Sequence, residues 1–424
     1  LISRMGELGT YQVVVVGGGP AGLMAAGQSA RLGAHTLLLE KMDQPGLKLR
    51  ITGKGRCNIT NIAPQEEFIS HFGREGQFLR QAFSLFFNED LIDFMASIGV
   101  NTIVERGGRV FPAEGDASQI TRKIAVWSVN QGVEIQTNTA VQRLLLEDPI
   151  ITGVESNSGM IIPCQQVILA TGGASFSHTG SSGDGFRIAT EIGHTIIPIR
   201  PALVPLKTAG DICQRMQGLS LKNIEATVLI NGKSSIKDFG ELLFTHFGIS
   251  GPIILSMSGK MVDALRAKNK VELSIDLKPG MDEKKLEARL LRDIDEHGKR
   301  HFRSLLENLL PQKMVMVMAD TCNIPLDKPC HQISIQDRAN LLRWLKDFRV
   351  EINGHLPLDA AMVTAGGVSL KEVDPRTMQS KLMQGLYFAG EVLDLAADTG
   401  GYNLQAAFST GWLAGNSAAK VALP

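Results

Sequence analysis

A cation and a thiol stand next to each other in a glycine-rich stretch near the start of the sequence. Residues 48–58 read KLRITGKGRCN, in which Lys48, Arg56, Cys57 and Asn58 could do chemistry. Lysine and arginine suit charge-assisted hydrogen bonds to phosphate or ring oxygens, and asparagine both donates and accepts at a ring edge. The thiol of Cys57 is open to two interpretations: it donates a proton to a reacting group, or it is a small side chain that only packs.

A second candidate for chemistry is His246, in the stretch FTHFGISGP at residues 244–252. A histidine and two glycines interrupt apolar, strand-like sequence there, so His246, with Thr245 and Ser250, could line a substrate pocket and take part in catalysis. The alternative is a histidine whose hydrogen bonds are satisfied structurally. We expect no metal site. The five cysteines are scattered without a CxxC pair, which disfavours a zinc ribbon, a redox dithiol and a disulfide framework.

The first pattern along the chain that could position such residues is strand, glycine turn, helix and strand at residues 11–41. A continuous apolar run leads into Gly17, Gly19 and Gly22, and a small-residue helix then leads to a second strand that ends at Glu40. In such a unit the glycines allow a tight turn, room for a pyrophosphate and close helix packing, and the helix offers free N–H groups to the phosphates. The carboxylate can accept hydrogen bonds from an adenosine ribose, which favours FAD or NAD over NADP.

Two further stretches decide between these cofactors. Residues 165–176 form a buried-type strand that runs into ATGG, and residues 385–415 supply another strand, Gly390 and Glu391, and then GGYN at the start of a long helix. We expect the acid after the glycine to bind the ribityl or pyrophosphate region. The helix should point its N-terminus at the flavin, where its dipole stabilises the negative charge of the reduced ring. The three stretches in this order predict FAD.

We expect the FAD-binding residues to come from these stretches and from the glycine-rich loop. They are Gly17, Gly19, Pro20, Ala21, Gly22, Glu40, Lys41, Lys48, Gly55, Arg56, Cys57, Asn58, Val141, Ala170, Thr171, Gly172, Gly173, Gly390, Glu391, Gly400, Gly401, Tyr402, Asn403 and Leu404. The catalytic candidates are Cys57 and His246, and no metal ligand is expected.

Composition and charge limit the class of protein. The chain has 424 residues, enough for two or three domains, and 43 basic residues balance 43 acidic ones. No global positive field therefore draws it to nucleic acid or membrane, although a local basic patch remains open. It has no run of about eighteen apolar residues, and residues 1–12 lack the profile of a secretory signal, so we expect a cytoplasmic protein.

The middle of the sequence differs in character from the two ends. Three prolines in residues 194–206 end the α/β pattern, and Asn231 and Gly232 give a hairpin signal between apolar runs. Farther along, apolar residues recur at helical spacing, and the polar faces are rich in Lys and Arg, which either solvation or nucleic-acid contact would explain. We predict an FAD-binding domain at 1–195 and 354–424, a β-barrel-like insert at 196–280 and 349–353, and a helical subdomain at 281–348.

Several motifs carry a resemblance to a known family. They are the glycine fingerprint, TGKGRCNITN at 52–61, TGSSGDGF at 179–186, LLFTHFGISGP at 242–252, and GLYFAGEVLD with TGGYNLQ near the C-terminus. Over nearly its whole length the chain resembles the BaiN/RdsA (YhiN-type) family of NAD(P)/FAD-dependent oxidoreductases, also called aminoacetone-oxidase-family enzymes. The resemblance implies an α/β fold: a Rossmann-like FAD domain of the two-dinucleotide-binding type, built from both chain ends, with an inserted β-barrel and a small helical subdomain. It also implies that the glycine-rich loop lies along the FAD.

The sequence departs from the family pattern at two places. Members often have Gly-Arg-Lys where this chain has Gly46, Leu47 and Lys48, so one expected cation is missing. Lys54 stands where glycine is common, which adds a charge and reduces backbone freedom. These changes bear on individual phosphate contacts and not on FAD binding as a whole.

The leading hypothesis for function is an FAD-dependent reductase that acts on an activated carbon–carbon double bond. The sequence has no second GxGxxG fingerprint and no CxxC pair, so NADH or NADPH would visit the flavin transiently as electron donor. The resemblance implies two substrate types: uracil in 23S ribosomal RNA, giving dihydrouridine, and small enones of the steroid or bile-acid kind. An RNA substrate would need a basic groove, for which Lys54, Arg56 and the helical insert are candidates.

Two alternatives come from other classes of protein. One is an amine oxidase that passes electrons to oxygen, and the other is a flavin-bound structural or regulatory RNA-binding protein. Bleaching of the flavin by NADH or NADPH favours the reductase, and bleaching by amines alone favours the oxidase. Flavin that nothing reduces, together with salt-sensitive RNA binding, favours the third hypothesis.

Overall fold

The structure is a computed structural model that describes residues 11–423, with the exception of the side chain of Lys54. Residues 1–10, on which most of the prediction about a secretory signal rests, lie outside this range. The chain divides into two compact units. The first is Leu1–Pro201 with Ala361–Pro424, and the second is Ala202–Ala360. The finer division into three parts, with its boundaries near residues 195, 280, 348 and 353, remains a proposal.

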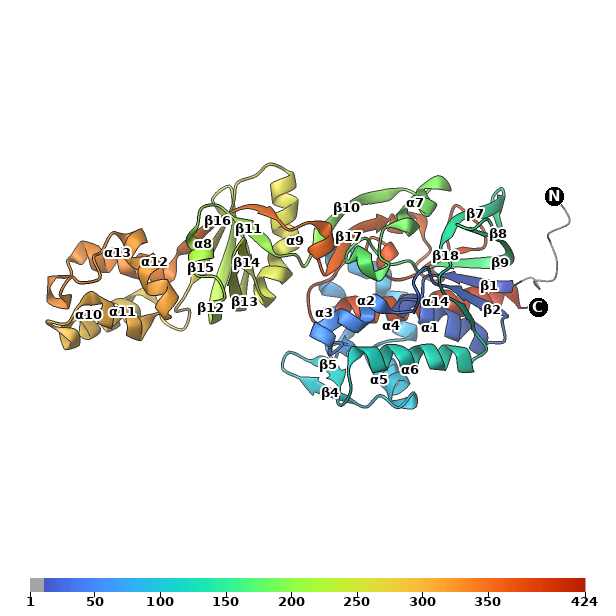
Figure 1. Ribbon diagram of the computed structural model, residues 1–424, viewed down its shortest axis with the longest axis horizontal. Coiled ribbons are helices and arrows are strands. Elements are labelled where there is room, and N and C mark those ends of the chain that lie inside the picture. The colour runs from blue at the N-terminus through green and yellow to red at the C-terminus, as the bar shows by residue number, and fades with distance from the viewer. Residues whose placement is uncertain (1–10, 424) are drawn as a thin grey trace. The chain divides into compact units, whose positions relative to one another are not determined.

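The first unit contains a mixed seven-stranded sheet (Figure 1). Its strands, in spatial order, are β6 (Glu134–Gln136), β2 (Thr36–Leu39), β1 (Tyr11–Val16), β9 (Ile161–Leu169), β8 (Ile150–Ser156) and β7 (Val141–Glu147), and β18 (Leu386–Phe388) also pairs with β9. The pairs among β6, β2, β1, β9 and β18 are parallel, whereas β7, β8 and the first half of β9 are antiparallel. Strands β1, β2 and β18 are almost wholly buried, which explains their continuous apolar sequences.

The register of the parallel strands aligns their carboxyl ends. Val16 pairs with Leu39 on one side and with Leu169 on the other, and Leu169 in turn pairs with Phe388. The segments that follow these strands therefore leave the sheet at one edge. Loops at the carboxyl ends of parallel strands form the ligand sites of open α/β sheets.

Helices from opposite ends of the chain pack against each other beneath the sheet. Helix α1 (Pro20–Arg31) and helix α14 (Tyr402–Ala422) lie side by side (Figure 1). A Cβ at Gly411 would lie 2.3 Å from the carbonyl oxygen of Ala21, and one at Gly415 would lie 2.3 Å from that of Ala25. Only glycine allows this close approach. The two chain ends thus form one domain because small residues face each other along the helix pair.

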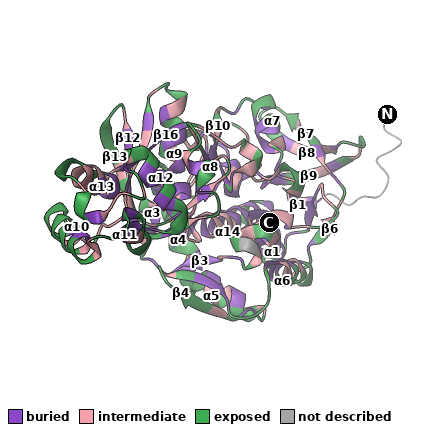
Figure 2. Cartoon of the chain, turned by 60° about the vertical axis from the view of Figure 1, so that its left-hand side comes forward, coloured by how far each residue is buried: buried purple, intermediate pink, exposed green. Residues whose placement is uncertain are grey.

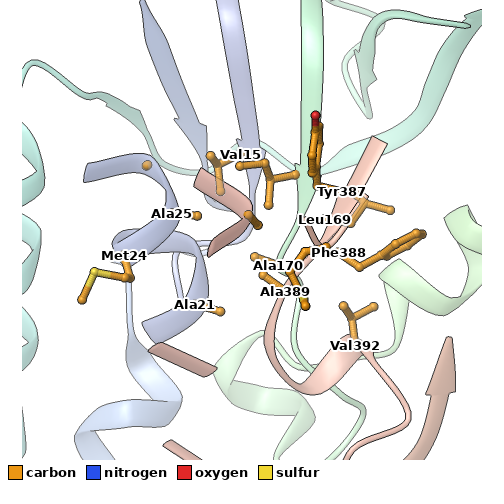
Figure 3. Close-up of a cluster of buried hydrophobic side chains, with 14 of the residues drawn as sticks. Val15, Ala21, Met24, Ala25, Leu169, Ala170, Tyr387, Phe388, Ala389 and Val392 are labelled. Carbon is orange, nitrogen blue, oxygen red and sulfur yellow. The ribbon is translucent and has the colours of Figure 1, made fainter. Parts of the chain in front are cut away.

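The core of the first unit joins these helices to the sheet. Figure 3 shows buried side chains of β1, β9 and β18, among them Val15, Leu169 and Phe388, close to Ala21 and Ala25 of α1. Each of these five side chains is buried. A tightly packed core of this kind fixes the position of the start of α1 relative to the sheet edge.

The other elements of the first unit surround this core. The helices are α2 (Leu47–Ile51), α3 (Gln65–Ser70), α4 (Arg80–Leu85), α5 (Asn88–Ser97), α6 (Ala117–Asn130) and α7 (Asp184–Glu191), and the short 3₁₀ segments include η2 (Thr52–Gly55) and η8 (Gly390–Val392). The strands are β3 (Thr60–Asn61), β4 (Thr102–Glu105) and β5 (Arg109–Pro112), which form a three-stranded sheet, and β10 (Ile196–Ala202), which pairs with β17 (Val363–Val368).

The second unit contains the predicted barrel. Six strands close on themselves in the order β11 (Leu206–Thr208), β14 (Gly248–Ser250), β13 (Lys233–Thr245), β12 (Ser220–Ile230), β15 (Val271–Asp276) and β16 (Phe348–His355), with α8 (Ile212–Arg215) and α9 (Pro252–Arg266) beside them. The predicted hairpin turn joins β12 to β13, where Asn231 and Gly232 both have positive φ, 51° and 78°. Positive φ at both central positions is the requirement of the tight turn that asparagine and glycine favour.

A small helical subdomain interrupts the barrel between β15 and β16, as predicted. It contains α10 (Glu283–His297), α11 (Phe302–Leu309), α12 (Gln312–Cys322) and α13 (Ile335–Lys346). Helix α10 buries Leu286, Leu290 and Ile294 and exposes most of its other residues (Figure 2). Apolar residues four positions apart lie on one helix face, which is why the helical spacing in the sequence predicted these elements correctly.

Candidate functional site

The glycine turn after β1 forms a cradle at the sheet edge. Gly17 has φ +104°, and a Cβ at Gly22 would lie 1.8 Å from the carbonyl oxygen of Gly17, so both positions require glycine. A Cβ at Gly19, by contrast, would meet no atom within 4 Å. Helix α1 begins directly after Gly19, and no side chain caps its first N–H groups. Open space beside an uncapped helix N-terminus fits a pyrophosphate.

Glu40, at the end of β2, lies against the same turn. Its Oε2 accepts a hydrogen bond from the N–H of Gly18 at 2.8 Å, and its Oε1 accepts one from Met42 at 2.8 Å. Burial raises the pKa of this carboxyl, although the two backbone N–H groups oppose the shift. The carboxylate is positioned beside the cradle, and its predicted contact with a ribose stays a prediction.

Lys41 joins the end of β2 to the loop that precedes α7. Its Nζ lies 2.6 Å from Asp184 Oδ2 and also donates to the hydroxyl of Ser182. Both partners belong to the TGSSGDGF motif. A Cβ at Gly180 of this motif would lie 2.9 Å from Met42 Cγ, so the loop packs closely on the same segment. The predicted cofactor residue Lys41 thus connects two segments of the candidate site.

Lys48 and Glu391 were predicted separately, and the structure brings them together. Lys48 Nζ lies 2.7 Å from Glu391 Oε2 and 2.8 Å from the hydroxyl of Ser175. Glu391 Oε1 accepts a hydrogen bond from the N–H of Thr364 at 2.7 Å, and the Thr364 hydroxyl accepts one from Ala174 at 2.8 Å. This network connects α2, the loop after β9, β17 and η8. Sequence reasoning missed Ser175, although it follows ATGG in the 165–176 stretch, and Thr364, which no local motif marks.

Two buried oxygens near this edge have no hydrogen-bond partner among the described atoms: Thr171 Oγ1 and Asn58 Oδ1. Thr171 follows β9, and a Cβ at Gly185 would lie 2.0 Å from its hydroxyl oxygen, so α7 packs directly on it. A buried polar atom without a partner is costly unless a ligand or water supplies one. These atoms, the cradle and the uncapped helix together fit a bound FAD.

The glycine-rich loop places its cation and its thiol in different surroundings. Arg56 forms an ion pair with Glu105, and its guanidinium lies over the Phe111 ring, 4.4 Å from the centroid. Cys57 has φ +58° and is 1% exposed. Burial raises the pKa of the Cys57 thiol to about 11, so the sulfur is a neutral thiol near pH 7. This disfavours an activated nucleophile. Proton donation by Cys57 remains a prediction.

Side chains from the first turn of α14 fix the start of that helix against neighbouring segments. Gly401 has φ +98°, and a Cβ there would lie 2.4 Å from the carbonyl oxygen of Thr60. Tyr402 stacks on His71 with 3.9 Å between ring centroids, and Asn403 both accepts from and donates to the backbone of Ala397, at 2.9 and 3.0 Å. These side chains are engaged within the protein. The helix N-terminus itself therefore remains as the group that could face a flavin.

One pair at this helix start was not foreseen from the sequence. His71 Nδ1 lies 3.0 Å from Asp398 Oδ2. Asp398 precedes the glycines of a predicted cofactor motif, so its position carried a signal. His71 lies just after α3, and nothing local marks it. The pair and the stacked Tyr402 ring fix the loop between η8 and α14.

The remaining predicted cofactor residues lie on several elements of the first unit. Val141 begins β7, just after a segment in which Thr139 donates its N–H to the Glu40 carbonyl at 2.9 Å. Gly390 packs on α1, where a Cβ would lie 2.8 Å from that of Ala21. The other predicted cofactor residues are Pro20 at the start of α1, Gly55 in η2, Ala170, Gly172 and Gly173 after β9, Gly400 just before α14, and Leu404 on α14.

His246 lies in the second unit, in the turn between β13 and β14. It is exposed and contacts the Phe247 ring edge to face, with 4.9 Å between centroids. Thr245 accepts a hydrogen bond from the N–H of Gly248 at 3.1 Å and so stabilises the turn. A catalytic role for His246 stays a prediction.

Within residues 11–423, no group of three or more His, Cys, Asp or Glu side chains is arranged to hold a metal ion. His297 and His301 have the spacing of a metal-binding pair, but each Nδ1 bonds to a backbone oxygen, that of Asp293 at 2.7 Å and that of Asp327 at 2.6 Å. None of the helices in the described range is long and apolar enough to cross a membrane.

Comparison with known proteins identifies the family. The sequence profile described as "HI0933-like protein Rossmann domain" matches residues 11–417, nearly the whole chain. The chain belongs to this family. It is 30% identical to the 3-dehydro-bile acid delta(4,6)-reductase of Clostridium scindens, over 96% of this chain and 99% of the relative. It is 29% and 31% identical to the ribosomal RNA dihydrouridine synthases of Escherichia coli and Haemophilus influenzae, over 95% and 94% of this chain and 96% of each relative.

These relatives confirm the predicted resemblance and the class of protein. The HI0933-like chain is a flavoprotein oxidoreductase with FAD as its cofactor. Its fold is also similar to that of 3-ketosteroid-delta4-(5alpha)-dehydrogenase from Rhodococcus jostii RHA1, with a TM-score of 0.52, 15% identity, and 99% of each chain covered. A flavocytochrome c3 fumarate reductase gives a TM-score of 0.51 at 18% identity, covering 99% of this chain and 80% of the other. At such low identity these likenesses bear on the fold alone.

Proposed function

We propose that this protein is an FAD-dependent reductase that saturates an electron-poor carbon–carbon double bond, with uracil in 23S ribosomal RNA as its substrate and dihydrouridine as product. The observation that carries the proposal is the similarity to two ribosomal RNA dihydrouridine synthases, which extends over at least 94% of this chain and 96% of each relative. Similarity of that extent includes both units and not only a cofactor domain. A cytoplasmic location, where ribosomes are found, is part of this proposal.

The residues of the candidate site have separate roles in this reaction. The uncapped start of α1 would hold the pyrophosphate, and Glu40 beside it would accept from the ribose. The start of α14 would stabilise negative charge on the ring. Bound FAD would supply the hydride that the substrate carbon receives. The neighbouring carbon needs a proton, for which Cys57 and His246 are the candidates within this chain.

The electron donor in this proposal is NADH or NADPH. The described residues contain one glycine cradle of the dinucleotide type, at Gly17 to Gly22, and no second fingerprint occurs in the sequence. A nicotinamide would therefore bind transiently in the place that the substrate later takes. Such an order gives ping-pong kinetics.

A second candidate is the reduction of a small enone. The relative named as a bile-acid delta(4,6)-reductase aligns with 96% of this chain and is itself covered to 99%. A conjugated ketone and uracil share a double bond polarised by a carbonyl group, so one site chemistry suits both. The substrates differ in size and charge, and only RNA carries phosphates.

The experiment that tests the proposal is deletion of the gene in its host, followed by mapping of dihydrouridine in ribosomal RNA. We expect the modification to disappear, to return with the intact gene, and not to return with a Gly19→Asp copy. Unchanged ribosomal RNA would reject uracil as substrate. Anaerobic flavin reduction by NADH or NADPH, followed by reoxidation with a bile-acid-like enone, would then identify the second candidate.

A further inference from the structure

Three cations lie where the turn after α10 meets the start of α11: Lys299 and Arg300 in the turn, and Arg303 in the first turn of α11. We call this segment the basic turn. All three are exposed, whereas Phe302 between them is buried. The buried ring anchors the segment in the helical subdomain. The cationic side chains consequently project from a fixed base into solvent.

Backbone hydrogen bonds hold the basic turn in place. Arg300 accepts from Cys330 at 2.9 Å, and Arg303 donates to Leu326 at 3.0 Å. Phe302 donates to Lys328 at 2.9 Å in the same pairing. The turn is therefore braced against a second segment, and its shape does not depend on the three charged side chains.

The cations of the basic turn differ from four other cations of the helical subdomain, which are held in ion pairs. Ion pairs there join Lys285 to Asp282, Arg289 to Asp293, Lys328 to Asp337 and Arg338 to Glu287, at 3.4, 3.5, 2.6 and 3.8 Å. Across the described residues, no carboxylate lies within ion-pair distance of Lys299, Arg300 or Arg303. Three unpaired positive charges within five residues repel one another, and a partner with several negative charges would remove that repulsion.

We propose that the basic turn binds the phosphate backbone of RNA. The inference rests on the proposed function, the reduction of uracil in ribosomal RNA. The chain as a whole has no net charge, so attraction to RNA requires a local concentration of unpaired cations, and the basic turn is one. Arginine forms bidentate bonds to phosphate, and Arg300 and Arg303 supply two such groups. Phosphate contacts position an RNA without reading its sequence.

The test uses the FAD-loaded, full-length protein and ribosomal RNA purified from the deletion strain. The variant Lys299→Gln/Arg300→Gln/Arg303→Gln removes the three charges. Each phosphate contact contributes about 0.7 to 0.9 to the slope of log K against log salt, so the slope should fall by roughly 2 to 3. Flavin reduction by NADH or NADPH and the thermal unfolding midpoint should stay unchanged.

The matched control is Lys284→Gln/Lys285→Gln/Arg289→Gln, with the same change of charge in the first half of α10. These positions are 10 to 15 residues before Lys299, which is roughly 15 to 23 Å at 1.5 Å per residue along the helix. We expect the control to keep the wild-type salt slope. An equal loss in the control would show a general charge effect and overturn the proposal.

The outcomes separate this inference from the proposed function. The inference alone would be overturned if the wild-type protein forms dihydrouridine but the basic-turn variant binds ribosomal RNA with the wild-type affinity and the wild-type salt slope. A wild-type protein that neither binds nor modifies ribosomal RNA would overturn both. Polyglutamate of equal charge could also be used to compete with ribosomal RNA for the protein. If it competes as effectively as RNA, the basic turn would be assigned to an acidic protein partner instead.

Discussion

Lys48 Nζ lies 2.7 Å from Glu391 Oε2, an ion pair between residues 343 positions apart. The pair connects α2 of the N-terminal half to η8 of the C-terminal segment, and Ser175 and Thr364 complete the hydrogen bonds of both partners. Both side chains are only about one-fifth exposed. The two segments that were each expected to contact the cofactor are therefore joined to each other, so the site is already organised by the protein.

We expect Lys48→Met to lower the free energy of unfolding by about 1 to 3 kcal/mol, because it leaves the Glu391 carboxylate partly buried without its cation. Glu391→Gln should cost a similar amount. The double variant should cost about 1 kcal/mol less than the sum of the two, as contacting residues are coupled. Urea unfolding of the four proteins measures this cycle, and additive losses would show that the pair contributes no coupling.

Gly19→Asp should separate folding from FAD binding. The open space at Gly19 admits a side chain, and aspartate is a favoured helix N-cap. The free energy of unfolding should therefore stay equal or rise by about 0.3 kcal/mol. The added carboxylate would occupy the phosphate cradle, and two like charges at about 4 Å repel by several kcal/mol at most. FAD affinity should fall by roughly a hundredfold or more, measured by flavin fluorescence on titration.

Gly22→Ala serves as the contrasting variant. Its Cβ would lie 1.8 Å from the carbonyl oxygen of Gly17, so the helix must shift away from the strand. We expect a loss of about 2 to 3 kcal/mol in unfolding free energy, with FAD affinity reduced as a consequence. If Gly22→Ala unfolds at the wild-type urea concentration, the tight packing of α1 on β1 is not a requirement of the fold.

Cys57 should resist alkylation in the folded protein. With a thiol pKa of about 11, about one sulfur in three thousand is ionised at pH 7.5, and burial blocks access besides. Cys322 has a similarly raised pKa, about 11, but is less buried, so it is the internal comparison. Iodoacetamide labelling followed by peptide mass spectrometry should modify Cys322 before Cys57. Equal labelling rates without denaturant would contradict the buried, neutral thiol.

Cys57→Ala distinguishes the two interpretations of the thiol. If Cys57 donates the proton, flavin reduction by NADH or NADPH stays at the wild-type rate and only reoxidation by the double-bond substrate slows. If Cys57 only packs, both half-reactions keep their rates and the unfolding free energy falls by about 1 kcal/mol. Stopped-flow absorbance measures the two half-reactions separately.

We expect His194 to make the stability of the fold depend on pH. It is buried, with Nδ1 3.1 Å from Glu372 Oε2 and Nε2 2.9 Å from the Ser380 hydroxyl. That hydroxyl also accepts the N–H groups of Leu382 and Met383, at 3.0 and 2.9 Å, so its own hydrogen points to Nε2. The imidazole is therefore neutral in this arrangement. Burial lowers the pKa of His194 below its ordinary value of 6.5, although Glu372 opposes the shift.

Because the folded-state pKa of His194 lies below the unfolded value, the unfolded chain binds the proton first as pH falls. The contribution of His194 to stability is complete above about pH 6.5 and decreases below it, as the pH approaches the folded-state pKa. Urea unfolding at pH 7.5 and pH 5.5 should show lower stability at the acidic pH. His194→Gln should reduce this difference, and a His194→Gln protein with the full wild-type pH dependence would assign the effect to other groups.

Much of the fold follows from local sequence. The strand, glycine turn and helix at Val16 to Gly22 were predictable because buried parallel strands are continuously apolar and each glycine meets a specific steric demand. The hairpin at Asn231 and Gly232 and the amphipathic α10 were predictable for similar local reasons.

The candidate site depends on contacts that no local pattern encodes. Lys48 with Glu391, His71 with Asp398, and Arg56 with Glu105 are partners far apart in the sequence. The position of β18 beside β9 brings the C-terminal segment to the edge where the loop after β1 leaves the sheet. The sequence by itself determined which elements form and that a dinucleotide cradle follows β1. The tertiary structure alone decided which charges face each other, because pairing across tens to hundreds of residues is set by sheet order and helix packing, which the local pattern of side chains leaves open.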